Sequence, residues 1–570
     1  MFGASIFQRF DFRSRSASIA SSLFGFFFGL WFLGPKNVLP GSIGWTSRGD
    51  IFASQLSWQF FRSTPIFQWP ITEIPNYGVG WGSLFQFTVG NNVIGIPFKL
   101  FNSILPDNFQ FLGIWVVLCF VLQGFFAERL MSRFALSKLQ CFIASLIFIL
   151  SPTFLFRIGP IGHLELGAHW VIIAALFLYF GSNQKASNWA ALISVSVMIQ
   201  PYLLVMVIAI FVAMLGKELL VKKAARSNSS ISRLTILPLV IFVFMCFVLG
   251  YLPLGGDSMG VGFFRLNVLA FFNPGFSSTD SFSFLLDHSK FFNLRQFAAE
   301  EGEGFQYIGL GIIIFIPVAL LCLWSQRRSL SIRAIVPLLF VCGALFLIAT
   351  SNRIVVVRHE FYFWLPQSIL DARQIFRTAT RFAWPLYYLV TAIVVVASAR
   401  FFSKFNLATL AIILIASVQL IDGWPGMVKS HNVISADYAT NSPFVDPVWT
   451  SIAKNYEKIS LVPTFDIQDD DRPAITQDDQ NIVSTFRFAS FAAENGMSIN
   501  FAYNARPVTE HVNRENAKTA LELASGQLEV DAIYVFFEER SWNEARSHLP
   551  PDSEAVVIDG FFLILGPLSS

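Results

Sequence analysis

The sequence is poor in charge, and this scarcity excludes a soluble globular protein. Only 14% of its 570 residues are charged, 54% are hydrophobic, and the mean hydropathy is +0.57. A water-soluble chain of this length needs a larger charged share to cover its surface. The sequence therefore predicts an α-helical polytopic membrane protein with membrane lipid around it.

Other features are scarce or absent as well. The five cysteines all fall inside apolar runs, where they act as small buried side chains, so no disulfide framework is visible. The net charge of +3 argues against a nucleic-acid partner. No internal repeat of solenoid period and no low-complexity segment is evident. These absences exclude nucleic-acid binders, disulfide scaffolds and solenoids.

What the chain does have is a series of long apolar runs. They lie near residues 18–33, 109–130, 137–157, 164–181, 187–215, 234–253, 305–325, 334–350, 382–399 and 406–422. Nine of the ten runs have about the length of one membrane crossing. The first follows Arg9, Arg13 and Arg15, and no small-residue cleavage site comes after it. We therefore expect an uncleaved anchor with a cytoplasmic N-terminus.

The exceptional run is 187–215, which is too long for one crossing. Lys185 precedes it, and a basic cluster from Lys217 to Arg233 follows it. By the positive-inside rule both flanks belong to the cytoplasm, so the chain enters and leaves on the same face. Pro201 is the expected break between two short helices of a hairpin or re-entrant pair. With this hairpin the chain makes about 11 membrane passes.

Four long segments then lie on the extracytoplasmic side. Three are loops of the membrane domain 1–425, at 39–108, 253–304 and 351–381, and the fourth is the C-terminal region 426–570. In that region the stretches KISLVP, SINFAY, DAIYVFF and AVVIDGFFLIL have the pattern of strands, and NAKTALELASG has that of an amphipathic helix. We expect a small soluble α/β domain there.

The first loop holds two candidate catalytic carboxylates. Asp50 follows the stretch TSRG shortly after the first membrane helix, and Glu73 lies in WPITEIPNYGVGWGS. A carboxylate at the membrane surface is suited to general-base catalysis. The alternatives are a helix N-cap for Asp50 and an ordinary loop residue for Glu73. The glycines at 78, 80 and 82 lack the strand-to-helix context of a phosphate cradle and are expected to be turn residues.

The stretch RIGPIGHLELGAHW carries His163, Glu165 and His169 at the outer end of a membrane helix. Glu165 and His169 share a helix face at i,i+4 spacing, and ionisable groups at membrane depth usually face an internal cavity. The three side chains are candidates for lining a substrate site, for binding a divalent metal, or for a satisfied helix-end cluster. Their spacing matches no known zinc motif.

The stretch DARQIFRTATRFAWP precedes a late apolar run and carries Arg373, Arg377 and Arg381 at intervals of four, so that on a helix they share one face. They lie on the outer side, where the positive-inside rule disfavours them. Guanidinium groups there are suited to a phosphate or pyrophosphate head group whose lipid tail lies between helices. The alternatives are snorkelling to lipid phosphates and pairing with acidic loop residues such as Asp371 or Glu360.

Five blocks of the sequence resemble those of a family of uncharacterised bacterial polytopic membrane proteins. The blocks are GD-x-FASQLSWQFFR-x-x-P, LPDNFQFLGIWVVLCFVLQG, GHLELGAHW, EGFQYIGLG and FRTATRFAWPLYYL. That family is similar in layout to the GT-C glycosyltransferases. These enzymes have a long first external loop with a catalytic acid, a polyprenyl-phosphate sugar donor and often a soluble C-terminal domain. The resemblance implies a protein of the bacterial inner membrane whose C-terminal domain faces the periplasm.

By this resemblance Asp50 takes the position of the catalytic acid, and Arg377 and Arg381 match a basic block ahead of a late membrane helix. The implied reaction moves a sugar from a polyprenyl-phosphate donor to a saccharide or lipid-linked acceptor of the cell envelope. A transporter or flippase of a lipid-linked saccharide needs the same arginines but no base. No cofactor is assigned with certainty, and a divalent metal is a possible ligand. Asn91 and Asn92 stand where the family often has a further acid, and this departure puts a second carboxylate, and a metal with it, in doubt.

Overall fold

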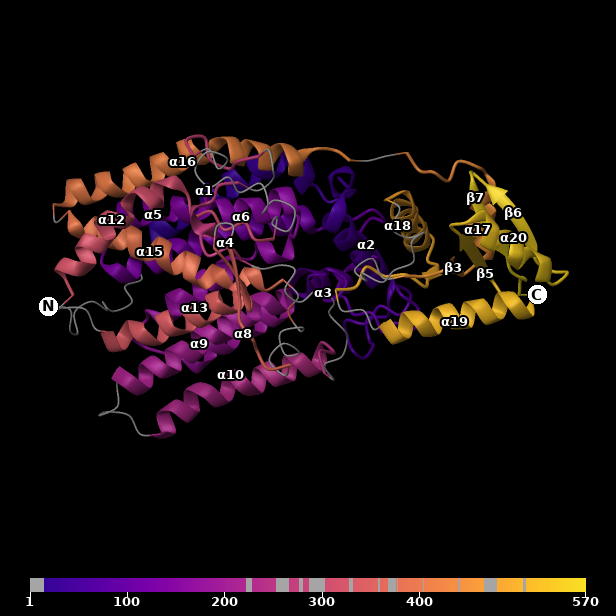
Figure 1. Ribbon diagram of the computed structural model, residues 1–570, viewed down its shortest axis with the longest axis horizontal. Helices are drawn as coiled ribbons and strands as arrows, with labels where there is room; N and C mark the ends of the chain where they lie inside the picture. The colour runs from indigo at the N-terminus through magenta and orange to yellow at the C-terminus, as the bar shows by residue number, and fades with distance from the viewer. Residues whose placement is uncertain are drawn as a thin grey trace. The chain divides into compact units, whose positions relative to one another are not determined.

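The computed structural model describes residues 15–221, 228–252, 266–275, 280–286, 303–327, 332–356, 359–367, 376, 378–402, 404–438, 441–465, 479–505 and 509–569. The chain divides into two compact units. The helical unit comprises Met1–Trp45, Phe111–Met245 and Val261–Ala436, and the sheet unit comprises Thr46–Gln110, Cys246–Gly260 and Asp437–Ser570. Figure 1 shows the long helices of the first unit and the strands of the second.

The helical unit follows the apolar runs of the sequence. Its main helices are α1 (Arg15–Leu33), α4 (Leu112–Met131), α5 (Lys138–Ile149), α6 (Pro152–Phe156), α7 (Trp170–Tyr179), α8 (Ala186–Ile199), α9 (Pro201–Val221), α12 (Leu310–Ser325), α13 (Ile332–Thr350), α15 (Trp384–Phe401) and α16 (Phe405–Ser435). α10 (Asn228–Val248) contributes residues to both units. Within the helical unit α9 packs against α13, and the two lie side by side in Figure 1.

Several of these helices are suited to a membrane. Among the described residues, seven helices are long and apolar enough to cross one, and an eighth span results if the bent pair Lys138–Ile149 and Pro152–Ile161 is counted as one. α7, α8 and α12 are apolar but shorter. The chain is therefore a mostly helical, multi-pass membrane protein. The predicted total of about 11 passes is not confirmed and stays a prediction.

The break expected inside the run 187–215 is confirmed. α8 ends at Ile199, Gln200 is extended with φ −164° and ψ 130°, and α9 begins at Pro201. The expectation of two short helices is wrong for α9, which has 21 residues and qualifies as a span by itself. It continues past the apolar run through Lys217, a good helix former that is buried here and donates a hydrogen bond to the carbonyl of Tyr179.

Small residues bring α1 and α4 into close contact. A Cβ atom at Gly25 would clash with the carbonyl oxygen of Phe120, and one at Gly124 would clash with that of Ser21. Membrane helices associate in this way, because small residues let the two backbones approach and gain packing contacts that lipid does not supply.

The structure describes the two later predicted loops, 253–304 and 351–381, to different extents. Most of the loop 253–304 lies outside the described residues, although its last two residues are included. In the loop 351–381, β1 (Arg353–Val356) and β2 (His359–Tyr362) form an antiparallel pair that the sequence reading did not expect. The predicted domain boundary at 425/426 stays a prediction.

The sheet unit contains a five-stranded sheet. Its strands are β3 (Lys458–Val462), β4 (Ser498–Ile499), β5 (Ala532–Phe536), β6 (Glu554–Ile558) and β7 (Phe561–Leu565), in the order β4-β3-β5-β7-β6. The first three are parallel, and β7 and β6 are antiparallel to their neighbours. Its helices are α2 (Gly49–Ser63), α3 (Asn92–Leu100), α17 (Val448–Asn455), α18 (Asp479–Glu494), α19 (Thr509–Ser525) and α20 (Glu539–Ala545).

The predicted strands and the helix of the C-terminal region are confirmed. The stretch AVVIDGFFLIL forms two strands rather than one, because Asp559 and Gly560 make a two-residue turn with φ values of 50° and 83°. An Asp-Gly pair favours this turn, since both positions need positive φ.

Residues of the first loop extend the edge of this sheet. Tyr77 forms a parallel bridge with Ile499 of β4, and the N–H groups of Gly78 and Val79 each donate to the carbonyl of Ile499 at 3.0 Å. α2 packs against α18. The glycines at 78, 80 and 82 have φ values of 74°, 78° and 66°, which confirms that they are turn residues.

Candidate functional site

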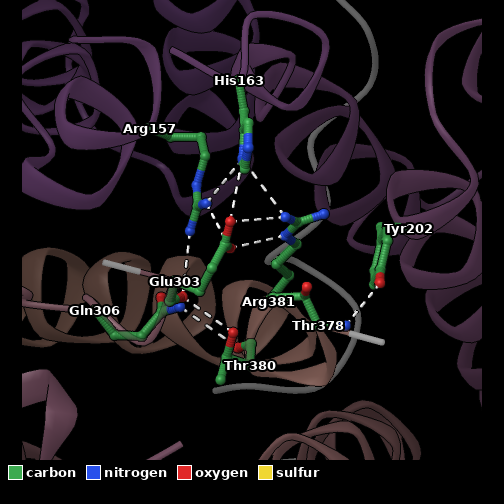
Figure 2. A network of polar contacts seen from close by, with 8 residues as sticks. All are labelled: Arg157, His163, Tyr202, Glu303, Gln306, Thr378, Thr380 and Arg381. Carbon is green, nitrogen blue, oxygen red and sulfur yellow. Dashed lines mark hydrogen bonds and ion pairs between the residues drawn. The ribbon is translucent and has the colours of Figure 1, made fainter. Parts of the chain in front are cut away.

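In the helical unit, charged side chains from separate segments meet at one carboxylate. We call Arg157, His163, Glu303 and Arg381 the Glu303 cluster. Arg157 begins the short π-helix η6 (Arg157–Ile161), which follows α6 directly, and His163 comes just after it. Arg381 lies in the 3-10 helix η10 (Ala379–Ala383), which runs into α15. Figure 2 shows the side chains turned toward Glu303.

Both arginines bind the carboxylate of Glu303. Nη1 of Arg157 lies 2.7 Å from Oε2, while Arg381 uses two nitrogens, with Nε 3.1 Å from Oε2 and Nη2 2.9 Å from Oε1. Nδ1 of His163 is 3.3 Å from Oε1. The two-point contact of Arg381 is the geometry in which guanidinium recognises carboxylate and phosphate most strongly.

The main chain of Glu303 is held as well. Its carbonyl oxygen accepts hydrogen bonds from Nη2 of Arg157 at 3.3 Å and from Oγ1 of Thr380 at 3.0 Å. Gln306 in turn donates to the carbonyl of Thr380 at 3.4 Å. Glu303 is therefore fixed at two points, its carboxylate and its carbonyl.

The cluster is largely shielded from solvent. The side chain of Arg157 is 0% exposed, that of Arg381 9% and that of Glu303 12%. Burial by itself raises the pKa of Glu303, but the nearby charges of Arg157, Arg381 and His163 outweigh it and hold that pKa well below the ordinary value of 4.5. Glu303 is ionised at neutral pH, and the stability from this shift is present above pH 4.5 and lost only as the pH falls through the depressed pKa.

Aromatic rings flank both guanidinium groups. The guanidinium carbon of Arg381 lies 4.6 Å from the ring centroid of Tyr202, and that of Arg157 lies 5.4 Å from the ring centroid of Trp384. The Tyr202 hydroxyl accepts a hydrogen bond from the backbone N–H of Thr378 at 2.9 Å, which joins α9 to the segment that carries Arg381. Cation–π contacts stabilise both charges where water is scarce.

The two predicted histidines have different partners. His163 belongs to the Glu303 cluster, whereas Nδ1 of His169 lies 2.7 Å from the hydroxyl of Tyr388 and its ring lies 4.1 Å from that of Trp384. The expected common helix face of Glu165 and His169 is wrong. Glu165 is buried in a 3-10 helix (Glu165–Gly167), and α7 begins only after His169, at Trp170.

Of the three predicted arginines, the structure describes Arg381; Arg373 and Arg377 lie outside the described residues. Thr378 has φ −102° and ψ 71°, so a helix that carried Arg377 would not continue unbroken to Arg381. A common helix face for Arg373 and Arg377 stays a prediction. Arg381 pairs with an acidic loop residue, as one alternative expected, but this residue is Glu303. Glu360 pairs instead with Arg353 at 2.9 Å.

In the sheet unit, Asp50 lies in the first turn of α2, and the N-cap position belongs to Arg48. The N-cap alternative for Asp50 is therefore wrong. Its Oδ1 atom accepts a hydrogen bond from the Tyr503 hydroxyl at 2.7 Å, and the backbone N–H of Tyr503 donates to the Tyr77 hydroxyl at 3.0 Å. A half-buried carboxylate is thus oriented by a residue that follows β4.

The other polar residues of the first loop have local roles. Glu73 is half-buried in the loop, and its backbone forms an isolated antiparallel β-bridge with Leu84. Asn91 caps α3 by accepting from the N–H of Val93 at 3.2 Å, and Asn92 donates to Gln86 at 3.2 Å.

The arrangement of His, Cys, Asp and Glu side chains bears on the metal alternative. Among them, no three His, Cys, Asp or Glu side chains converge in a way that would hold a metal ion. Two guanidinium groups beside one carboxylate and one imidazole favour an anion over a cation.

Three residues of these sites were missed by the sequence reading. Arg157 ends the run 137–157, and a lone arginine at the end of an apolar run is a signal that was available. Glu303 opens the block EGFQYIGLG, which carries part of the family resemblance, and this was an available signal, although Glu303 was not singled out from it. Tyr503 lies in the predicted strand stretch SINFAY, where nothing marks it as a partner of Asp50.

The fold and the helices define a multi-pass membrane protein. The chain belongs to the family described as Domain of unknown function (DUF6311), whose model matches residues 22–424, and the DUF6311 C-terminal domain matches residues 448–566. No curated protein matches the chain. Among solved structures it is similar to an oligosaccharyltransferase of Archaeoglobus fulgidus in the apo form. The identity is 10% and the TM-score 0.38, over 86% of this chain and 65% of that one, so that the chain spans less than two thirds of that structure's length.

Proposed function

We propose that the chain is a membrane glycosyltransferase of GT-C type. It moves a sugar from a polyprenyl-phosphate-linked donor to a saccharide or lipid-linked acceptor on the extracytoplasmic face of the bacterial inner membrane. The observation that carries this proposal is the Glu303 cluster, in which two shielded guanidinium groups converge just ahead of α15. Such a cluster is suited to the phosphate of a lipid whose chain lies among apolar helices.

In this proposal the guanidinium groups of Arg157 and Arg381 bind the donor phosphate. As the bond from the sugar to the phosphate oxygen breaks, that oxygen keeps the electron pair and gains charge, which the guanidinium groups stabilise. Arg373 and Arg377 act with them, and His163, Glu165 and His169 line the donor site.

Asp50 is the proposed general base. It takes the proton from an acceptor hydroxyl as the hydroxyl oxygen forms its bond to the anomeric carbon. Glu73 is the second candidate for this role. The geometry that supports Asp50 is its short hydrogen bond with Tyr503, which orients the carboxylate.

The experiment that tests the function is turnover by the purified protein. A labelled polyprenyl-phosphate sugar is given with a mixture of envelope saccharides, and transfer of the label is followed. Label that reaches a saccharide supports the enzyme. Label that only crosses the bilayer of a proteoliposome, still on its lipid, identifies a transporter or flippase instead.

A second experiment tests on which face of the membrane the proposed catalytic groups lie. A reporter that is active only outside the cytoplasm, fused after Ser430, is expected to be active, and the same reporter fused near Lys223 is expected to be silent, because Lys223 lies in a basic cluster. Activity at Lys223 would place the proposed catalytic groups on the cytoplasmic face and contradict the proposal.

A further inference from the structure

A cavity of about 530 Å³ lies in the helical unit, where the ends of α4 and α7 meet the beginning of α8. We call it the Arg133 cavity. Its lining includes Arg133, which follows α4, and Lys185, which immediately precedes α8. Among the described residues that line it, none is acidic. Small-molecule sites have volumes of about 300–1,000 Å³, so the cavity is large enough for a head group. Two cations without an acid attract an anion.

The guanidinium group of Arg133 is held in place by its surroundings. Its central carbon lies 4.1 Å from the ring centroid of Phe177, and the side chain is half-buried. A Cβ atom at Gly181 would lie 3.4 Å from Nη2 of Arg133, so the glycine lets the loop backbone approach the guanidinium group. A planar group fixed in this way loses little conformational entropy when it binds a phosphate at two points.

The loop between α7 and α8 is fixed by one buried side chain. Nε2 of Gln184 donates to the carbonyls of Leu178 at 2.9 Å and Gly181 at 2.8 Å, and its Oε1 accepts from Nε1 of Trp189 at 3.0 Å. These bonds join the end of α7 to the beginning of α8. The wall of the Arg133 cavity is therefore built by internal hydrogen bonds, and it has its shape before a ligand binds.

The N-terminus of α8 adds a third attractive element. Lys185 is its N-cap residue and makes no side-chain cap hydrogen bond. Asn188 lies in the first turn, and both side chains line the cavity and are exposed. The first N–H groups of a helix carry partial positive charge, because no carbonyl within the helix accepts from them. This end of α8 thus adds to the attraction that the two cations exert on an anion.

The position of the cavity along the membrane helices indicates a lipid as the source of that anion. Arg133 is the last residue but one of the candidate span Leu112–Phe134. Lipid phosphates lie at the ends of such spans, and basic pockets between membrane helices bind them. A choline or ethanolamine head group would bring a further cation to Arg133 and Lys185, whereas a glycerol head group brings only hydroxyl groups.

We propose that the Arg133 cavity is a binding site for the phosphate head group of an anionic phospholipid. Arg133 binds the phosphate at two points, Lys185 supplies a second positive charge, and the N-terminus of α8 faces the same group. The site goes beyond the proposed sugar transfer and does not depend on it, because none of its residues belongs to the Glu303 cluster or to the Asp50–Tyr503 pair. No covalent bond forms or breaks.

The test measures lipid binding to the delipidated full-length protein by native mass spectrometry from a non-ionic detergent. The two probes are dioleoylphosphatidylglycerol and dioleoylphosphatidylcholine, which share their acyl chains and differ in net charge. We expect the wild type to bind one phosphatidylglycerol at least about tenfold more tightly than phosphatidylcholine. Equal affinities for the two lipids would overturn the proposal.

Two substitutions test the cavity itself. Arg133→Gln should weaken binding of phosphatidylglycerol at least about tenfold, because a charged two-point contact is lost. Lys185→Gln should weaken it about fivefold, since one positive charge is removed. If Arg133→Gln does not fold, Lys185→Gln decides the question, because the Lys185 side chain is exposed. The matched control is Lys404→Gln, which removes an exposed charge outside the cavity and should leave the affinity within about twofold.

Other results would overturn the proposal. An unchanged affinity in Lys185→Gln, or an equal loss in Lys404→Gln, would show that the lipid is attracted by surface charge in general. Competition with sn-glycerol 3-phosphate tests a soluble source of the phosphate. We expect phosphatidylglycerol to stay bound at equal concentrations of the two, and its displacement would assign the cavity to a soluble phosphate instead.

Discussion

The Glu303 cluster and the Asp50–Tyr503 pair both hold a carboxylate, but they compensate its charge differently. Glu303 is 12% exposed and is bound directly by two guanidinium groups. Asp50 is half-buried, accepts a hydrogen bond from the neutral Tyr503 hydroxyl and has the charge of Arg48 nearby. A shielded ion pair is costly to break, because the remaining charge stays buried. We therefore expect substitutions in the cluster to affect both folding and binding, and substitutions of Asp50 to affect chemistry alone.

The largest difference between loss of activity and loss of stability is expected from Asp50→Asn. Asparagine keeps the size and accepts the Tyr503 hydrogen bond but cannot take a proton, so single-turnover sugar transfer should fall about 10²–10⁴-fold. Donor affinity and thermal stability should stay near those of the wild type. Near-normal transfer would remove Asp50 from the mechanism. Glu73→Gln is the parallel variant, and loss of transfer in it beside an active Asp50→Asn would assign the base to Glu73.

Arg157→Ala should lower the stability of the protein, which Asp50→Asn leaves near that of the wild type. It removes one of the two guanidinium groups that compensate a buried carboxylate, and the free energy of unfolding should fall by about 3 kcal/mol. Thermal unfolding of the purified protein in detergent measures this change. Arg353→Ala, which breaks the exposed pair with Glu360, is the control and should cost no more than about 1 kcal/mol. Equal losses in the two variants would show that burial does not distinguish them.

Arg381→Ala tests whether the Glu303 cluster binds a lipid phosphate. Affinity for a polyprenyl phosphate should weaken by about 1.5–3 kcal/mol, since a charged hydrogen bond is lost. Arg381→Lys should restore only part of it, because lysine keeps the charge and loses the two-point contact. An unchanged affinity in Arg381→Ala would leave Arg381 as a structural partner of Glu303 alone.

The smallest effect is expected from Tyr503→Phe, which removes only the hydroxyl that orients Asp50. Transfer should fall about tenfold, corresponding to about 1.4 kcal/mol for a hydrogen bond to a charged group. The acid limb of the pH–rate profile should also move to higher pH, because the ionised carboxylate loses a donor. A lower rate with an unmoved profile would indicate a purely structural role for Tyr503.

Much of the fold follows from the sequence because its causes are local. Apolar runs fix the positions of the long helices, Pro201 begins α9 where a proline is tolerated, and Asp559-Gly560 makes the turn of a hairpin. These features need only neighbouring residues. The length of α9 was less well predicted, because the helix extends past the apolar run into a charged segment whose Lys217 is buried through a contact with Tyr179, in another helix.

The sites were predicted only in part, because their pairings join distant residues. Arg381 and His163 were named from their sequence stretches. Their common partner Glu303 opens the block EGFQYIGLG, but no local pattern pairs it with an arginine far away in the sequence. Arg157 was counted as the end of an apolar run, and only the fold shows that it turns toward Glu303. Spacing of four residues suggested a helix face at 165–169, where the structure has a 3-10 helix over Glu165–Gly167. At the other stretch Arg381 lies in the 3-10 helix Ala379–Ala383.

The hydrogen bond from Tyr503 to Asp50 joins residues that are 453 positions apart, and the bridge from Tyr77 to Ile499 adds the first-loop segment to a strand that is synthesised much later. At a translation rate of about 5–20 residues per second, roughly 20–90 s pass between the appearance of Asp50 and that of its partner. During that interval the nascent chain holds its early helices and the whole of α2, but the edge strand β4 on which the 76–79 backbone pairs does not yet exist. A chain shorter than 503 residues therefore lacks the hydroxyl that orients the proposed base, so the geometry of Asp50 depends on a residue that is added 453 positions later.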